Sequence, residues 1–74
     1  MKTDKDWENQ VKGVLKAELA RKSIGYKDLV GRLAVLGITE TPENIANKIS
    51  RGKFTAVFLM QCLEAIECQT VRLY

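Results

Sequence analysis

The chain has 74 residues, with 12 basic and nine acidic side chains, two cysteines and no histidine. A chain of this length forms at most one domain, here residues 1–74, and buries only about 60% of the surface that its unfolded form exposes. Without histidine or a CxxC pair it lacks the residues on which zinc sites and Ser-His-Asp hydrolases depend. We therefore expect no enzymatic activity, no metal, no cofactor and no small-molecule substrate.

Three further features bear on the compartment. The N-terminal segment MKTDKDWENQ is charged and lacks the apolar core of a secretory signal. The longest apolar runs are shorter than the roughly 20 residues that span a bilayer. Cys62 and Cys68 would point about 240° apart on a helix, so we interpret them as buried thiols of a reducing compartment. We expect a cytoplasmic protein that contacts no membrane.

The first predicted helix spans residues 4–22. Its apolar residues follow helical spacing and form one stripe, made of Trp7, Val11, Val14, Leu15 and Leu19. Glu18 lies on the same stripe. A carboxylate in that position either has a cationic partner or reaches water at the edge of the stripe, and the sequence leaves both alternatives open.

The second predicted helix spans residues 26–36. Gly25 is its expected N-cap, and Gly37 is expected to end it. Its expected buried face consists of Leu29, Val30, Leu33 and Leu36.

The third predicted helix spans residues 42–51. Thr41 followed by Pro42 is a start signal, since threonine caps a helix and proline suits the first helical position, and Gly52 ends the helix. On a helical wheel the apolar face consists of Ile45, Ala46 and Ile49. The opposite face carries Asn44, Asn47, Lys48 and Arg51, with Glu43 to one side.

The fourth predicted helix spans residues 56–67, with Thr55 as its N-cap. Its expected buried face consists of Phe58, Leu59, Cys62, Leu63 and Ile66. The tail, residues 69–74, alternates in a way that is compatible with a short strand, which would need a partner strand such as the same segment of a second subunit. Four short helices with brief connections predict an all-α fold, a compact four-helix bundle.

The polar face of the third helix has the chemistry of a nucleic-acid groove. Asparagine pairs with adenine through two hydrogen bonds, and arginine or lysine pairs with guanine. Lys53 and Thr55 follow the helix, where a cation and a hydroxyl could meet a backbone phosphate. Any amphipathic surface helix also has a polar outer face, so the wheel alone leaves this interpretation open.

The order of the segments resembles the helix-turn-helix domain of phage repressors and their bacterial relatives, the lambda-repressor-like or XRE-type superfamily. The matching positions are Leu29, Val30, Leu33, Gly37, Ile38, Ile49, the SRGK segment at 50–53, Leu59, Leu63 and Ala65. The resemblance covers residues 14–68. The segments NKISRGKF and FLMQCLEAI also look like a small bacterial family known mainly as a domain of unknown function.

The repressor resemblance implies a DNA-binding transcriptional regulator whose recognition helix, residues 42–51, lies in the major groove. Its implied base-facing residues are Asn44, Asn47, Lys48 and Arg51. Its implied phosphate-contacting residues are Tyr26, Lys27, Lys53 and Thr55. The expected partners are double-stranded DNA and a second copy of the chain. Such a homodimer would bind half-sites about one helical turn apart, through residues 70–74 or through Val57 and Met60.

The chain departs from the repressor pattern in ways that favour an alternative. Ser50 stands where the family often has a glutamate that pairs with an arginine of the first helix, and a swapped pair is one hypothesis. In it Glu18 meets one of three cations, Arg32, Lys48 or Arg51. The glutamines that often begin the second and third helices are absent, and Glu43 would repel a phosphate. The alternative is a helical protein–protein interaction module with the same fold and no DNA contacts.

Overall fold

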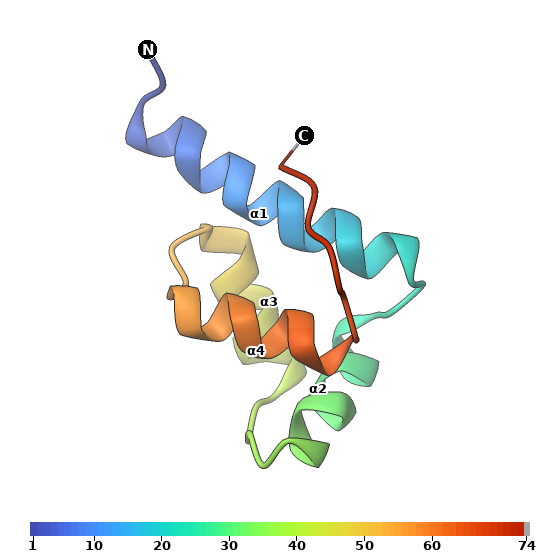
Figure 1. The fold of residues 1–74 in the computed structure, drawn as a ribbon. Helices are drawn as coiled ribbons and strands as arrows, with labels where there is room; N and C mark the ends of the chain where they lie inside the picture. Colours follow the sequence, from blue (N-terminus) through green and yellow to red (C-terminus); the bar gives the residue numbers. More distant parts are fainter. Residues whose placement is uncertain (74) are drawn as a thin grey trace.

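Four helices account for most of the chain in the computed structural model, which describes residues 1–73 (Figure 1). They are α1 (Asp4–Arg21), α2 (Tyr26–Val35), α3 (Pro42–Arg51) and α4 (Ala56–Ala65). The predicted all-α fold is confirmed. Each helix begins at the expected residue, and α1, α2 and α4 end one or two residues earlier than expected. None of the helices within residues 1–73 is both long enough and apolar enough to cross a membrane.

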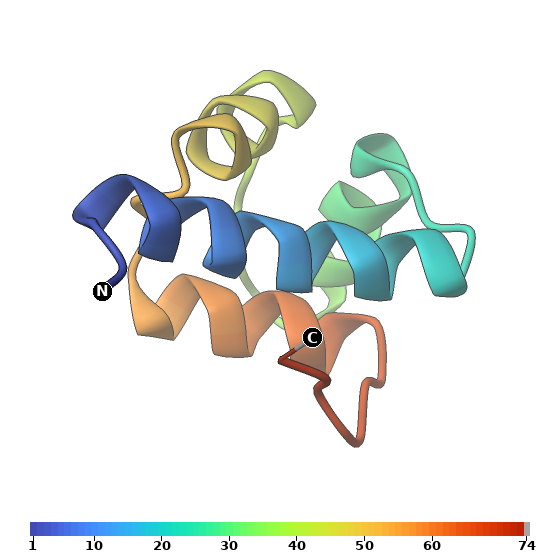
Figure 2. The same ribbon diagram turned by 90° about the horizontal axis from the view of Figure 1, so that it is seen from above.

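The helices pack so that α3 and the C-terminal tail lie on opposite sides of α1. Helix α3 contacts α1 and α2, and α2 also contacts α4. Figure 2 shows α1 running between α3 on one side and α4 with the tail on the other. The buried apolar side chains form one core, made of Leu15, Leu19, Ile24, Leu29, Leu33, Ile45, Ile49, Phe58, Cys62, Leu63 and Ile66.

Three threonines start three of the helices. The hydroxyl oxygens of Thr3, Thr41 and Thr55 accept hydrogen bonds from the backbone N–H groups three residues later, at 3.2, 3.1 and 3.0 Å. Each bond satisfies a donor that the first turn of a helix leaves free. At α2 the expected cap Gly25 has extended backbone and makes no side-chain bond. The predicted caps Thr41 and Thr55 are thereby confirmed.

Three helices end in the same left-handed turn. Ser23, Gly37 and Glu67 have φ of 56°, 81° and 57°. In each turn the following residue donates its backbone N–H to a carbonyl five positions earlier, the Schellman arrangement. In α2 this bond runs from Ile38 to Leu33, and it brings Ile38 back against the core. The turns therefore close the helices and also add apolar contacts.

Two residues assigned to buried faces are exposed. Trp7 is 54% exposed, because it borders an open hollow that it lines together with Leu59, Val71 and Leu73. Leu36 is 45% exposed, because α2 ends at Val35 and the chain turns at Gly37. This turn brings Ile38 against the core, and Leu36 is left at the surface. The predicted burial of Trp7 and Leu36 was wrong.

The tail forms no strand over residues 69–73; the last residue of the expected strand, Tyr74, lies outside the described residues. The tail instead crosses back over α1 (Figure 1). Gln10 Nε2 on α1 donates to the Leu73 carbonyl at 3.3 Å, and Cys68 Sγ donates to the Thr70 carbonyl at 3.1 Å. The Gln10–Leu73 bond holds the tail against α1, whereas the Cys68–Thr70 bond lies within the tail.

Candidate nucleic-acid interface

The face of α3 that the wheel marked as polar is largely open to solvent. Ile45 and Ile49 are buried in the core and fix the rotation of the helix. The exposed residues of α3 are Glu43, Asn44, Asn47, Ser50 and Arg51. Because the helix is anchored by its apolar face, the two amides and Arg51 point away from the core and are free to meet a ligand.

Lys48 differs from its neighbours on this face. Its Nζ lies 2.5 Å from Glu40 Oε2 and 4.7 Å from the centroid of the Phe58 ring. The Glu40 side chain is only 10% exposed, so Lys48 neutralises a nearly buried carboxylate. The structure thus gives Lys48 a structural contact, whereas the polar groups of Asn44, Asn47 and Arg51 have no hydrogen-bond or ion-pair partner among the side chains of residues 1–73.

Arg51 lies at the C-terminal end of α3 beside Lys53. The two residues, with Lys48 and Phe54, line a shallow hollow of about 170 Å³. Arg51 forms no ion pair within residues 1–73, and Lys53 Nζ lies 3.7 Å from Glu8 Oε2 while its side chain stays 69% exposed. An exposed pair at that distance contributes little, so Lys53 can turn to another anion at small cost.

The other three residues expected to contact phosphate, Tyr26, Lys27 and Thr55, differ in exposure and in hydrogen bonding. Lys27 is exposed on the first turn of α2, and Tyr26 is half-buried and packs against the core. The Thr55 hydroxyl already accepts the Phe58 N–H, which leaves its own hydrogen to donate. Of these residues, Lys27 is exposed and forms no ion pair within residues 1–73.

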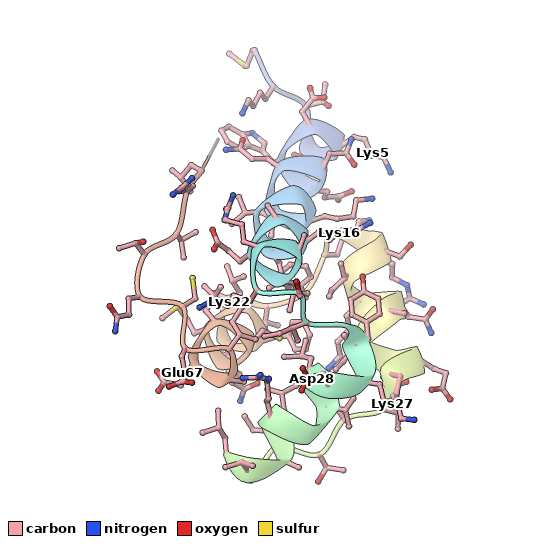
Figure 3. The ribbon with its side chains drawn as sticks, turned by 90° about the vertical axis from the view of Figure 1, so that its right-hand side faces the viewer. Lys5, Lys16, Lys22, Lys27, Asp28 and Glu67 are labelled. Carbon is pink, nitrogen blue, oxygen red and sulfur yellow. The ribbon has the colours of Figure 1, made fainter. Side chains whose placement is uncertain are left out.

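Helix α1 adds a row of cations that the sequence analysis missed. Lys5, Lys12 and Lys16 recur at seven- and four-residue spacing, which places them on one side of the helix. Lys12 Nζ donates to the Ser50 carbonyl at 3.1 Å, so this α1 lysine row runs beside α3. Figure 3 shows Lys5, Lys16 and Lys27 reaching toward the side where α3 lies. The heptad spacing in the sequence was the signal that could have revealed the row.

Glu18 has a partner, and it is none of the three cations proposed. The side chain is buried, and Glu18 Oε2 lies 2.5 Å from Nη2 of Arg21, one turn away on α1. The hydrogen bond from Arg21 lowers the pKa of Glu18 below its ordinary value of 4.5. Arg32 instead pairs with Asp28 at 3.1 Å. The swapped pair was therefore wrong, because Glu18 faces the tail side of α1 and not α3.

The cysteines are free thiols with suppressed ionisation. Cys62 is buried in the core, and burial raises its pKa to about 11. Cys68 is half-buried near Glu18, and partial burial and the neighbouring carboxylate raise its pKa as well. No group of three or more potential metal-ligating side chains gathers within the part of the chain that the structure describes.

These observations define an all-α protein of four helices whose third helix presents an exposed amide- and arginine-bearing face beside a row of lysines. The model of the family described as "Domain of unknown function (DUF6471)" matches residues 7–71. The chain therefore belongs to that family, in agreement with the narrower of the two resemblances. No curated protein and no solved structure matches the chain.

Proposed function

We propose that this protein binds double-stranded DNA as a transcriptional regulator, with α3 in the major groove. The observation behind the proposal is the position of three polar side chains, Asn44, Asn47 and Arg51, which are exposed and have no side-chain partner in the described part of the chain. They lie on an anchored helix that runs beside the α1 lysine row. The order α2, turn, α3 and the resemblance to lambda-repressor-like domains support the same interpretation.

In this arrangement base reading and phosphate binding fall to different residues. Asn44 and Asn47 carry the donor–acceptor pair that matches adenine, and Arg51 carries the fork that matches guanine. The α1 lysine row, with Lys27 and Lys53, supplies the positive charge for the phosphates on either side of the groove. Lys48 supports the interface indirectly, because its ammonium group neutralises the nearly buried Glu40 carboxylate.

A second copy of the chain completes the proposal. One helix in one groove makes few contacts, so a homodimer on a two-fold site with half-sites about 34 Å apart would multiply them. Val57 and Met60, which are 66% and 64% exposed and one turn apart on α4, are the side chains that we assign to a symmetric contact.

A titration with mixed-sequence duplex DNA at two salt concentrations tests the proposal. Binding should weaken steeply between about 50 and 200 mM salt, as counterion release requires, and Arg51→Ala should weaken it further. The matched control is Lys22→Ala, since Lys22 is exposed on the tail side (Figure 3). Absence of binding at low salt, with helix content intact, would reject the proposal.

The rival function is a protein–protein interaction module without DNA contacts. Glu43 favours it, because this exposed carboxylate stands in the first turn of α3, where a DNA phosphate would be repelled. Glu43→Gln separates the two functions in the same titration. A recognition helix should bind DNA more tightly once the charge is removed, and an interaction module should still show no DNA binding.

A further inference from the structure

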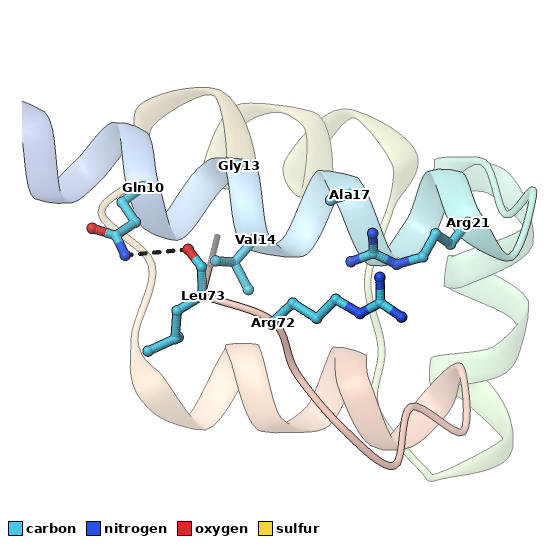
Figure 4. Close-up of a pocket in the computed structure, with 7 residues that line it drawn as sticks. All are labelled: Gln10, Gly13, Val14, Ala17, Arg21, Arg72 and Leu73. Atoms are coloured by element: carbon cyan, nitrogen blue, oxygen red, sulfur yellow. Dashed lines mark hydrogen bonds between the residues drawn. The ribbon is translucent and has the colours of Figure 1, made fainter.

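A row of hollows lies between α1 and the C-terminal tail, on the side of α1 away from α3 (Figure 2). Three adjoining hollows of about 260, 340 and 290 Å³ make it up. The first and second share Val14 and Leu73, and the second and third share Arg21 and Arg72 (Figure 4). We call this surface the tail groove.

The two ends of the tail groove differ in chemistry. At one end Trp7, Val14, Val71 and Leu73 make an apolar lining, and Trp7, Val71 and Leu73 remain 54%, 40% and 62% exposed. Apolar side chains held at the surface around one hollow are typical of a binding site. The Lys2 Nζ lies 4.5 Å from the centroid of the Trp7 ring, and the three side chains otherwise stay open to solvent.

The other end of the groove is positively charged. Arg21 and Arg72 line it together, with Lys22 beside them. The acidic side chain in the lining is Glu18, which is only 6% exposed and is already bound by Arg21. Figure 4 shows the guanidinium groups of Arg21 and Arg72 extending toward one another. Two like charges held close together are relieved by an anion that bridges them.

We propose that the tail groove docks an acidic amphipathic segment of a partner protein. The apolar side chains of that segment would lie against Trp7, Val71 and Leu73. Its carboxylates would meet Arg72 and the free N–H groups of Arg21, whose planar forks bind carboxylates through two parallel bonds.

The charges argue against two other occupants. A second copy related by a two-fold axis would offer the same lining, in which the acidic side chain, Glu18, is nearly buried and already bound by Arg21, so it brings no carboxylate to Arg72. Nucleic acid would meet the charged end but would leave the apolar end uncovered. Because α3 lies on the opposite side of α1, the groove and α3 can be occupied together (Figure 2).

A synthetic peptide of about 14 residues, with leucine at helical spacing and glutamate elsewhere, serves as the probe. Trp7 is the one tryptophan of the sequence and borders the groove, so its emission should shift to the blue on binding. Amide NMR shifts should gather at Gln10, Val14, Arg72 and Leu73. Arg72→Glu should weaken binding at least about tenfold, the equivalent of one charge-assisted hydrogen bond. Arg51→Ala, on the α3 side, should leave the affinity unchanged.

Four results would overturn this inference. The first is no change in Trp7 emission up to about 1 mM peptide, a limit that corresponds to roughly 4 kcal/mol of binding. The second is equal binding of a control peptide with lysine in place of glutamate. The third is a concentration-dependent blue shift without peptide, which would show that a second copy covers the groove. The fourth is competition between the peptide and duplex DNA, which would place both on one surface.

Discussion

Gly52, at the end of α3, lies directly against the backbone of Glu8 on α1. A Cβ atom built on Gly52 would stand 2.5 Å from the Glu8 carbonyl oxygen, and Gly52 also has φ of +66°. The contact brings the end of α3 onto the first turns of α1, next to the α1 lysine row. Glycine is therefore required at this position for two reasons, backbone conformation and space.

Gly52→Ala should destabilise the protein by roughly 2–5 kcal/mol. The left-handed backbone contributes about 1–2 kcal/mol of strain, and the overlap with backbone that cannot move aside contributes about 1–3 kcal/mol. Denaturant unfolding followed by circular dichroism measures the change. Gly13→Ala is the control, since a Cβ there meets nothing within 4 Å, and it should stabilise the protein by up to about 1 kcal/mol. Equal effects at the two positions would contradict the steric account.

The sequence predicted the local features of this fold better than the contacts between its helices. Thr41–Pro42 and Thr55 identified helix starts because capping depends on the neighbouring residues alone. Gly52 could be recognised as a helix end for the same reason, whereas its approach to Glu8 depends on how α1 crosses α3 and leaves no trace in local spacing. The polar face of α3 was predictable from its 3.6-residue period.

The partners of charged residues were the least predictable part of the candidate site. Lys48 has the wheel position of a base reader, yet it pairs with Glu40, eight residues away across a turn. Glu18 lies on the apolar stripe of α1. Whether it faces α3 or the tail depends on the path of the tail, whose Cys68 contacts Glu18 from 50 residues later in the sequence. The sequence placed Glu18 on the stripe but could not decide between a cationic partner and water, and could not select Arg21.

Ser23→Gly and Glu67→Gly should each stabilise the protein by roughly 0.5–1 kcal/mol. Both residues occupy the left-handed position of a helix-ending turn, with φ of 56° and 57°, where a side chain is strained and glycine is not. Thermal and denaturant unfolding of the two single variants and of the double variant test the prediction. Gly37→Ser, which places a side chain at φ of +81°, should have the opposite sign. Destabilisation by Ser23→Gly would mean that its side chain makes a stronger contribution than the strain.

The Glu18–Arg21 pair should make part of the stability sensitive to acid. Because the pKa of Glu18 is lower in the folded protein than its ordinary value of 4.5, the pair contributes fully above that value. The contribution is lost as the pH falls through the lowered pKa of the folded state. Glu18→Gln should remove this acid-dependent component and should be less stable at neutral pH. The exposed Glu64 provides the matched control, Glu64→Gln, which should keep the acid dependence of the parent. Parallel pH profiles for Glu18→Gln and the parent would contradict the prediction.

Cys62 should be unreactive while the protein is folded. Burial raises its pKa to about 11, so only about one thiol in a thousand is ionised at pH 8, and the core also blocks access of a reagent. A disulfide-exchange reagent followed by absorbance should detect the half-buried Cys68 first and Cys62 only on unfolding. In Cys68→Ser the native reaction should disappear, and a reaction of the folded protein that persists in this variant would show that Cys62 is accessible.

Lys48 and Arg51 should separate stability from DNA binding, although they lie three residues apart on α3. Lys48→Met leaves the nearly buried Glu40 carboxylate without its cation and should destabilise the protein by about 1–3 kcal/mol. The double variant Glu40→Gln with Lys48→Met should recover much of that loss, because no buried charge is then left unpaired.

Arg51→Ala removes an exposed side chain with no ion pair within residues 1–73, so it should change stability by less than about 0.5 kcal/mol. If α3 reads DNA, Arg51→Ala should weaken binding and relax the preference for the base that Arg51 contacts. Lys16→Ala should instead lower, by about one, the slope of the logarithm of the binding constant against the logarithm of the salt concentration. A loss of stability in Arg51→Ala equal to that in Lys48→Met would contradict this division between the two cations.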